Sequence, residues 1–264
     1  MQSESRLGKL LLRELEWDSQ HFELSVAEIL NPDLGYLELE KTLIEARSRG
    51  YQLIYWETPR VYRNESKVLK RYQGQLVDRK ACFKKHFTSA DRVYVRKTDD
   101  YQISLLSPQP SSSKLEKLAI EAGIHSRFGR DSRIPKDKFE ELYRIWIQRS
   151  TLGEIADFVL IISDVKQNIC GFVTATIKDS VGKIGLIAVD SGHRGKGLAS
   201  MLLRATHANM IERGAMSTEV ITQENNIPAC ALYIAAGYDL VELTSRYHFW
   251  PSDVSSIRTH LTVP

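Results

Sequence analysis

The sequence predicts an α/β (α+β) fold, with a mixed central sheet flanked by helices and an N-terminal α/β half-domain. Three observations predict it. Short apolar runs alternate with segments of helical periodicity over residues 1–95. From residue 157, three β-branched and aromatic runs follow one another with only turn residues between them. A strand-to-helix crossover comes next, which is typical of sheets covered by helices.

The N-terminal half-domain is expected to mix strands with short helices. Residues 9–30 predict two short strands around a turn at Trp17-Asp18-Ser19. A helix is expected up to Gly50, a residue typical of helix C-caps, and a buried strand over 51–56. The remaining expected elements are a short helix over 67–72 and a last pair of strands over 75–87.

A segment rich in proline and serine, SPQPSSS (107–113), has little to bury and predicts a loop or domain boundary. We expect a substrate-side α/β domain over 1–97 and a second domain over 98–264, which carries the strongest functional motif.

The second half predicts two helices, a meander and a crossover. Helical patterns cover 114–122 and 135–150, where Pro135 occupies a tolerated first-turn position. Three antiparallel strands are expected over 157–163, 168–178 and 183–189. The last expected elements are a helix over 195–213, a strand over 217–222, a helix over 227–236 closed by Gly237, and one or two strands up to Trp250.

Composition argues against several classes of protein. A formal charge of +3, with bases scattered among acids, makes nucleic acid an unexpected partner. No run of about 18 apolar residues predicts a membrane span, and no cleavage site follows the N-terminal apolar run, so we expect a cytoplasmic protein. Cys82, Cys170 and Cys230 are odd in number and lack zinc-ligand spacing, so we expect buried thiols and no metal.

Two local basic clusters, Arg79–Lys85 and Arg127–Arg133, interrupt this even charge distribution. Either cluster fits a solvated face, and the second also fits a site for an anionic substrate.

The strongest functional signal is the tract 184–214, in which a strand ends at Val189 and a polar loop leads into a helix. Gly195 and Gly197 let backbone N–H groups approach a ligand closely, and the helix N-terminus, Arg194 and Lys196 add positive charge. This inventory fits a pyrophosphate, although a lone Gly-x-Gly also fits a tight turn that caps a helix. The glycine spacing matches neither a P-loop nor the dinucleotide fingerprint.

A second signal lies in the helix predicted over 227–236. Seven residues at about 100° each bring Asn226 and Tyr233 within about 20° of the same helix face, so both can face one ligand. The alternative for Tyr233 is a core tyrosine packed against the sheet.

At these residues the chain resembles the GNAT N-acetyltransferase superfamily, whose phosphate loop reads Gln/Arg-x-x-Gly-x-Gly/Ala where Gly192-His-Arg-Gly195-Lys-Gly197 stands here. Gly192 departs from the Gln or Arg of that pattern. The resemblance continues through Asn226, Ala229, Tyr233 and Gly237-Tyr238. It implies acetyl-CoA as acyl donor, no metal, and loop amides that take the pyrophosphate while the strand ending at Val189 pairs with the pantetheine arm. The implied cofactor-binding residues are Ile187, Val189, Arg194, Gly195, Lys196, Gly197, Leu198, Ala199, Asn226 and Ala229.

The resemblance also implies the catalytic groups. Tyr233 is the expected general acid, because a phenol near the sulfur can protonate the leaving thiolate. Many GNAT enzymes place a Glu on the strand before the phosphate loop, whereas KIGLIAV here carries no carboxylate. The base is left open among water and the side chains of Asp157, Glu219, Glu224 and His125.

Over most of its length the chain resembles the TDP-fucosamine acetyltransferases, which acetylate the 4-amino group of a nucleotide-linked 4-amino-4,6-dideoxyhexose. The tracts 15–29 and 139–147 carry this resemblance together with Arg127-Phe128. It implies a sugar-nucleotide pocket walled by Trp17, Phe22, Arg127 and Phe128, in which Arg127 meets a diphosphate. Leu232 stands where that branch tends to have a basic residue.

Three alternatives remain open at this stage: a GNAT enzyme acting on another amine, such as a protein N-terminus, an antibiotic or a polyamine; a non-catalytic acyl-CoA-binding module; and a nucleic-acid binder. The oligomeric state is also open, with a homodimer among the alternatives.

Overall fold

The computed structural model describes residues 11–62, 66–92 and 98–251. The chain divides into two compact units, one up to Arg79 and again from Thr244, and the other over Lys80–Leu243. This division differs from the single cut expected between residues 97 and 98, because the last strand returns to the first unit. The chain passes from unit to unit within two long strands, β4 (Gln75–His86) and β10 (Asp239–Phe249).

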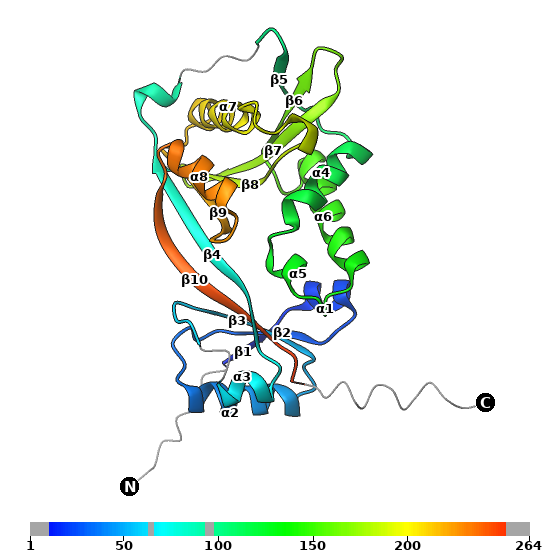
Figure 1. The fold of residues 1–264 in the computed structure, drawn as a ribbon, viewed down its shortest axis with the longest axis vertical. Helices are drawn as coiled ribbons and strands as arrows, with labels where there is room; N and C mark the ends of the chain where they lie inside the picture. Colours follow the sequence, from blue (N-terminus) through cyan, green and yellow to red (C-terminus); the bar gives the residue numbers. More distant parts are fainter. Residues whose placement is uncertain (1–10, 63–65, 93–97, 252–264) are drawn as a thin grey trace, which may run out of the picture. The chain divides into compact units, whose positions relative to one another are not determined.

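The first unit is a mixed sheet covered on one face by helices (Figure 1). Its strands β1 (Leu12–Glu14), β2 (Val26–Ile29) and β3 (Leu53–Thr58) lie in the order β1-β2-β3-β10. The β2–β3 pair is parallel and its neighbours are antiparallel. Helices α2 (Tyr36–Ser48) and α3 (Lys67–Arg71) pack their apolar sides on Ile54, Trp56, Tyr247 and Phe249.

Two expectations for the N-terminal half were wrong. The turn expected at Trp17-Asp18-Ser19 is part of helix α1 (Glu16–Phe22), in which the Ser19 hydroxyl donates to the Leu15 carbonyl and Glu23 ends the helix at φ 56°. The pair of strands expected over 75–87 is the single strand β4. Asp78 is the one turn-type residue in that segment, and without Gly or Pro beside it the strand continues through it.

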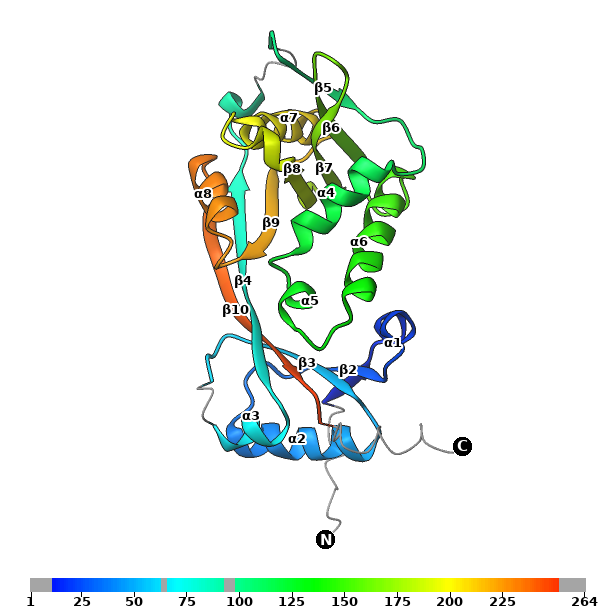
Figure 2. The ribbon, with the colours of Figure 1, turned by 45° about the vertical axis from the view of Figure 1, so that its right-hand side comes forward.

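The second unit is a mixed sheet with helices on both faces, which confirms the predicted fold class. Its strands follow the order β10-β4-β9-β8-β7-β6-β5, of which β10 and β4 also extend into the first unit, and α7 lies on one side while α4 and α6 lie on the other (Figure 2). The predicted meander is confirmed as β6 to β8, whereas β5 and α5 were not predicted. The bounds are β5 (Tyr101–Leu105), α4 (Ser113–Gly123), α5 (Arg127–Arg130), α6 (Lys136–Thr151), β6 (Phe158–Asp164), β7 (Ile169–Lys178), β8 (Val181–Val189), α7 (Leu198–Glu212), β9 (Ser217–Gln223) and α8 (Ile227–Ala235).

Strand β8 contains a bulge opposite β7, at the point where its pairing with β9 ends. Ile184 pairs with Ala175 and Ile187 with Val173, so Gly185 and Leu186 together oppose the single residue Thr174. The Thr174 hydroxyl accepts a hydrogen bond from the Leu186 N–H at 2.9 Å. Bulges bend a strand and increase its twist. The parallel pairing of β8 with β9 ends at this point, at Ile184↔Val220, so the rest of β8 has a free edge on its β9 side.

A buried histidine makes the stability of the second unit depend on pH. The His207 ring is 2% exposed and its Nε2 lies 2.7 Å from the Tyr238 hydroxyl. Burial, assisted by the charge of Lys85, lowers the pKa of His207 to about 4. The unfolded chain, with an ordinary pKa near 6.5, therefore binds more protons between these two values. We expect the stabilisation contributed by neutral His207 to be fully present above about pH 6.5. The free energy of unfolding should be lower by about 2 kcal/mol at about pH 5.

Urea unfolding at about pH 7 and pH 5 measures this loss, with His207→Gln as the comparison. An equal loss in the variant would assign the pH dependence to other groups. Tyr238→Phe removes the hydroxyl partner and leaves the imidazole in place, so it separates the lost hydrogen bond from the buried charge.

Candidate functional site

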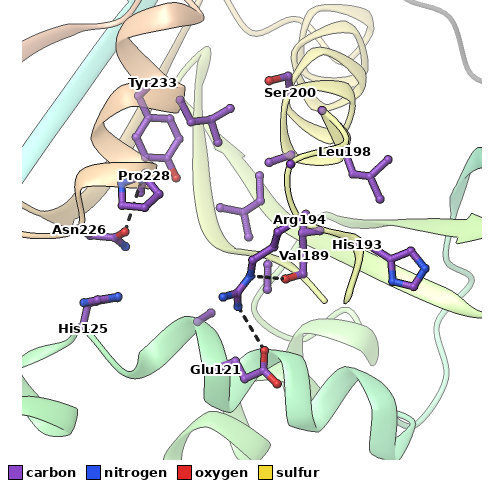
Figure 3. A pocket seen from close by; sticks show the side chains of 18 residues that line it. Glu121, His125, Val189, His193, Arg194, Leu198, Ser200, Asn226, Pro228 and Tyr233 are labelled. Carbon is purple, nitrogen blue, oxygen red and sulfur yellow. Dashed lines mark hydrogen bonds and ion pairs between the residues drawn. The ribbon is translucent and has the colours of Figure 1, made fainter. Parts of the chain in front are cut away.

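A cleft of ≈ 440 Å³ lies in the second unit, where β8 separates from β9 (Figure 3). Four segments line it: the end of α4 with His125, residues 187–189 of β8, the loop and first turn of α7, and one face of α8 with its cap Asn226. Ile187, Ala188 and Val189 pair with β7 on their other side, so their remaining backbone groups are directed away from β7, toward the cleft. An extended ligand carrying amide groups can pair with such an edge.

The loop after β8 presents backbone N–H groups to the cleft. Gly195 and Gly197 both have φ of +76°, a left-handed conformation that disfavours any side chain. No protein atom lies within 4 Å of where a Cβ would stand at either glycine, so this space is open to a ligand. Helix α7 begins at Leu198, and the first N–H groups of an α-helix have no acceptor within the helix. The arrangement is a cradle for an anion at a helix N-terminus.

Arg194 connects the two sides of the cleft. Its Nε donates to the Val189 carbonyl at 3.2 Å, and its Nη2 lies 3.4 Å from Glu121 Oε2 on α4. The arginine side chain is 63% exposed, so this ion pair contributes little to stability and is readily exchanged for another anion. A diphosphate is such an anion, and guanidinium groups bind phosphate oxygens bidentately.

Asn226 and Tyr233 lie on the cleft side of α8, as their spacing predicted (Figure 3). Asn226 caps the helix: its Oδ1 accepts from the Ala229 N–H at 3.4 Å. The Tyr233 ring is 2% exposed and packs 5.8 Å from Phe83 and 5.6 Å from Tyr238, measured between ring centroids. Burial raises the pKa of Tyr233 above its ordinary value, so its phenol is protonated at neutral pH. The Tyr233 ring belongs to the core and also lines the cleft, and its catalytic role stays a prediction.

The cleft collects nearly all of the residues expected to bind the cofactor. Ile187, Val189, Arg194, Gly195, Gly197, Leu198, Ala199, Asn226 and Ala229 line it, whereas Lys196 does not. The sequence reasoning missed Glu121, Ala122, Ala188, His193, Ser200, Pro228 and Leu232 as lining residues. Ala188 and Ser200 are adjacent in sequence to residues that were predicted to bind the cofactor, so they could have been predicted too. No local sequence pattern shows that α4 lies opposite α8.

The four residues expected to bind the acceptor fall in different units and none of them lines the cleft. Trp17 is 46% exposed and stacks on His21, while Phe22 is 3% exposed. In the second unit, the Arg127 guanidinium lies over the Phe128 ring, 4.6 Å from its centroid. Their role in acceptor binding stays a prediction.

Among the base candidates, His125 alone lines the cleft. Glu219 forms an ion pair with Lys84 at 3.1 Å, and Asp157 accepts a hydrogen bond from the Ile177 N–H. Glu224 is exposed.

Residues 123–238 match the model of the Acetyltransferase (GNAT) family. This segment belongs to the GNAT superfamily. A GCN5-related N-acetyltransferase from Kribbella flavida has the same fold, with a TM-score of 0.56 at 15% identity over 93% of this chain and 89% of that one. Among the helices of the described ranges, none combines the length and apolarity needed to span a bilayer.

Two curated relatives match parts of the chain. The spore coat polysaccharide biosynthesis protein SpsD of Bacillus subtilis is 27% identical over 149 residues, which is 54% of this chain and 50% of that protein. A streptothricin acetyltransferase of Escherichia coli is 36% identical over 62 residues, which is 24% of this chain and 36% of that protein. The chain therefore spans half or less of the length of these relatives.

Proposed function

We propose that the protein is an N-acetyltransferase that moves an acetyl group from acetyl-CoA to a primary amine. One observation carries the proposal: a single cleft joins the free edge of β8, the glycine loop at the start of α7 and the phenol of Tyr233. These three features suit, in turn, an amide-containing arm, a diphosphate and a leaving thiolate. The GNAT match of residues 123–238 supports the same assignment.

The residues present fit the donor part by part. The backbone of Val189 and Ile187 is available to pair with the pantetheine amides once Arg194 releases the Val189 carbonyl. Backbone N–H groups around Gly195 and Gly197 and at the start of α7 bind the diphosphate, and Arg194 adds a full positive charge. Acetyl-CoA, when bound, supplies the acetyl group as an activated thioester.

Two side chains are placed to move protons during the transfer. His125 is the base we propose, since it lines the cleft and its imidazole can take a proton from the acceptor's ammonium group, which leaves a neutral amine able to attack. The amine nitrogen then forms a bond to the acetyl carbon while the carbon–sulfur bond breaks. Tyr233 donates its proton to the departing sulfur. The nitrogen loses its second proton to solvent as the amide forms, and Tyr233 regains one from solvent.

For the acceptor, we propose the 4-amino group of a nucleotide-linked 4-amino-4,6-dideoxyhexose. The resemblance of most of the chain to the TDP-fucosamine acetyltransferases favours it, and SpsD is named for polysaccharide biosynthesis. The basic segment around α5 supplies Arg127, Arg130 and Arg133 in the same unit as the cleft, which suits a substrate with a diphosphate. The short match to a streptothricin acetyltransferase makes an antibiotic amine the second candidate.

A panel of acceptors tests this proposal. The full chain is incubated with radiolabelled acetyl-CoA and one of three amines: the nucleotide-linked 4-amino sugar, the same sugar without its nucleotide, or streptothricin. We expect transfer to the nucleotide-linked sugar with kcat/KM at least about 10-fold above either alternative, because the diphosphate adds charge-assisted hydrogen bonds. A higher kcat/KM with streptothricin would make an antibiotic amine the proposed acceptor in place of the nucleotide-linked sugar. Coenzyme A binding without transfer to any amine would favour a non-catalytic module.

A further inference from the structure

Three side chains of metal-ligating type lie together at the phosphate loop, and none of them has a role in the proposed acetyl transfer, although His193 also lines the cleft. They are Asp164 at the end of β6, Cys170 in β7 and His193 in the 3-10 turn Ser191–His193. One ligand atom from each lies within 4.8 Å of the other two. Their spacing in the sequence matches no zinc pattern, which is why the sequence predicted no metal.

The backbone explains why these residues meet. The β6–β7 hairpin brings Asp164 and Cys170 to one end of the sheet, and the Asp190 N–H donates to the Cys170 carbonyl at 2.8 Å. That bond fixes the start of the phosphate loop beside Cys170, and His193 follows one turn later. In Figure 3 the His193 ring projects away from the side of the cleft that holds Asn226 and Tyr233.

Asp164 and Cys170 are held in place by hydrogen bonds within the β6–β7 hairpin. Asp164 Oδ1 accepts from the N–H groups of Lys166 and Asn168 at 2.8 Å, and its Oδ2 accepts from the Asn168 side chain at 2.9 Å. Oδ2 therefore keeps one lone pair for a further partner. Cys170 is fully buried, with Sγ 3.3 Å from the Asn168 carbonyl.

His193 provides the observation that points to a ligand. Its Nδ1 has no solvent exposure and no hydrogen-bond partner, although Asp190 Oδ1 lies 4.0 Å away. A buried ring nitrogen without a partner costs free energy, and a metal ion removes that cost by accepting its lone pair. One carboxylate oxygen, one thiolate sulfur and one imidazole nitrogen form a ligand set that suits zinc.

We propose that Asp164, Cys170 and His193 bind a Zn²⁺ ion that fastens the β6–β7 hairpin to the phosphate loop. Ligand atoms around a tetrahedral zinc lie about 3.5 Å apart, given Zn–N near 2.0 Å and Zn–S near 2.3 Å. Binding therefore draws the three groups together by about 1 Å, which the Asp164 and His193 side chains supply by rotation. The Cys170 thiol loses its proton to solvent as the zinc–sulfur bond forms. Three protein ligands leave the fourth position of a tetrahedral zinc to a water molecule.

Calorimetry with ZnCl₂ on the metal-free full chain tests this site directly. We expect one equivalent to bind with a micromolar or tighter Kd. Cys170→Ala and His193→Gln should each raise the Kd at least about 100-fold, since loss of a group that merely orients a ligand already costs about 10–100-fold. Cys230→Ser removes a half-buried thiol far along the chain and should leave the Kd unchanged.

Cobalt gives a second readout that does not depend on enzyme activity. Co²⁺ added in place of zinc should produce a thiolate-to-metal charge-transfer band that Cys170→Ala abolishes and Cys230→Ser retains. His193 is partly exposed, so we expect His193→Gln to fold. It tests zinc binding even if Cys170→Ala fails to fold. No zinc binding by the wild-type chain, or equal binding by His193→Gln, would overturn the proposal. Neither result bears on coenzyme A binding, which is measured separately.

Discussion

Tyr233→Phe is expected to lower kcat for acetyl transfer by about 10²- to 10³-fold, within the range typical of a lost general acid. The phenylalanine ring fills the same space against Phe83 and Tyr238, so the core should stay packed. Only the proton donor is lost, and the thiolate then leaves unprotonated. The Kd for coenzyme A should change by less than about threefold, because the ring still lines the cleft. Steady-state rates combined with calorimetry separate the two effects.

Tyr238→Phe is the matched control for this substitution. Tyr238 lies 5.6 Å from Tyr233 between ring centroids and is equally buried, but its hydroxyl bonds to His207 and Thr218 and is not part of the cleft. It should lower stability while leaving kcat within a few fold of wild type. Equal losses of kcat in the two variants would assign the effect to packing. In the same assay, His125→Gln should lower kcat without changing coenzyme A affinity if His125 is the base.

Gly197→Ala is expected to weaken coenzyme A binding at least about 10-fold. The added methyl group forces a side chain into a left-handed conformation, which costs about 1–2 kcal/mol. It also projects into the open space that we assign to the diphosphate. Calorimetry with coenzyme A measures the loss of affinity.

Gly153→Ala provides the control, because Gly153 has nearly the same φ, +79°, with no atom within 4 Å of its Cβ position. It lies beyond α6 and outside the cleft, so it should destabilise the fold by a similar amount and leave the Kd for coenzyme A unchanged. A similar loss of affinity in both variants would mean that the glycine loop acts only through stability.

The parts of the site that were predictable from sequence are the local ones. The glycine loop depends on neighbouring residues, so its geometry follows from their φ angles. The Asn226–Tyr233 pair lies within one helix, so its geometry follows from helical periodicity. The meander was predictable for the same reason, since turn residues separate its strands. Asp-Ser within α1 was misleading because the serine hydroxyl bonds back into its own helix.

The rest depends on contacts between segments distant in sequence. The sequence KIGLIAV does not predict that Gly185 and Leu186 both lie opposite Thr174. The position of a bulge depends on the neighbouring strand as much as on the residues of the bulged strand. Glu121 and His125 enter the cleft only through the packing of α4 on the sheet. The convergence of Asp164, Cys170 and His193 requires both the hairpin and the loop.

Titration of the folded full chain with coenzyme A in a calorimeter tests most directly whether the loop after β8 is a diphosphate site. We expect saturable binding of one equivalent that weakens in Gly197→Ala and as salt rises, because Arg194 supplies part of the attraction. Absence of heat from wild-type protein, with folding verified by its unfolding transition, would contradict the assignment of the cleft and the acetyltransferase proposal built on it.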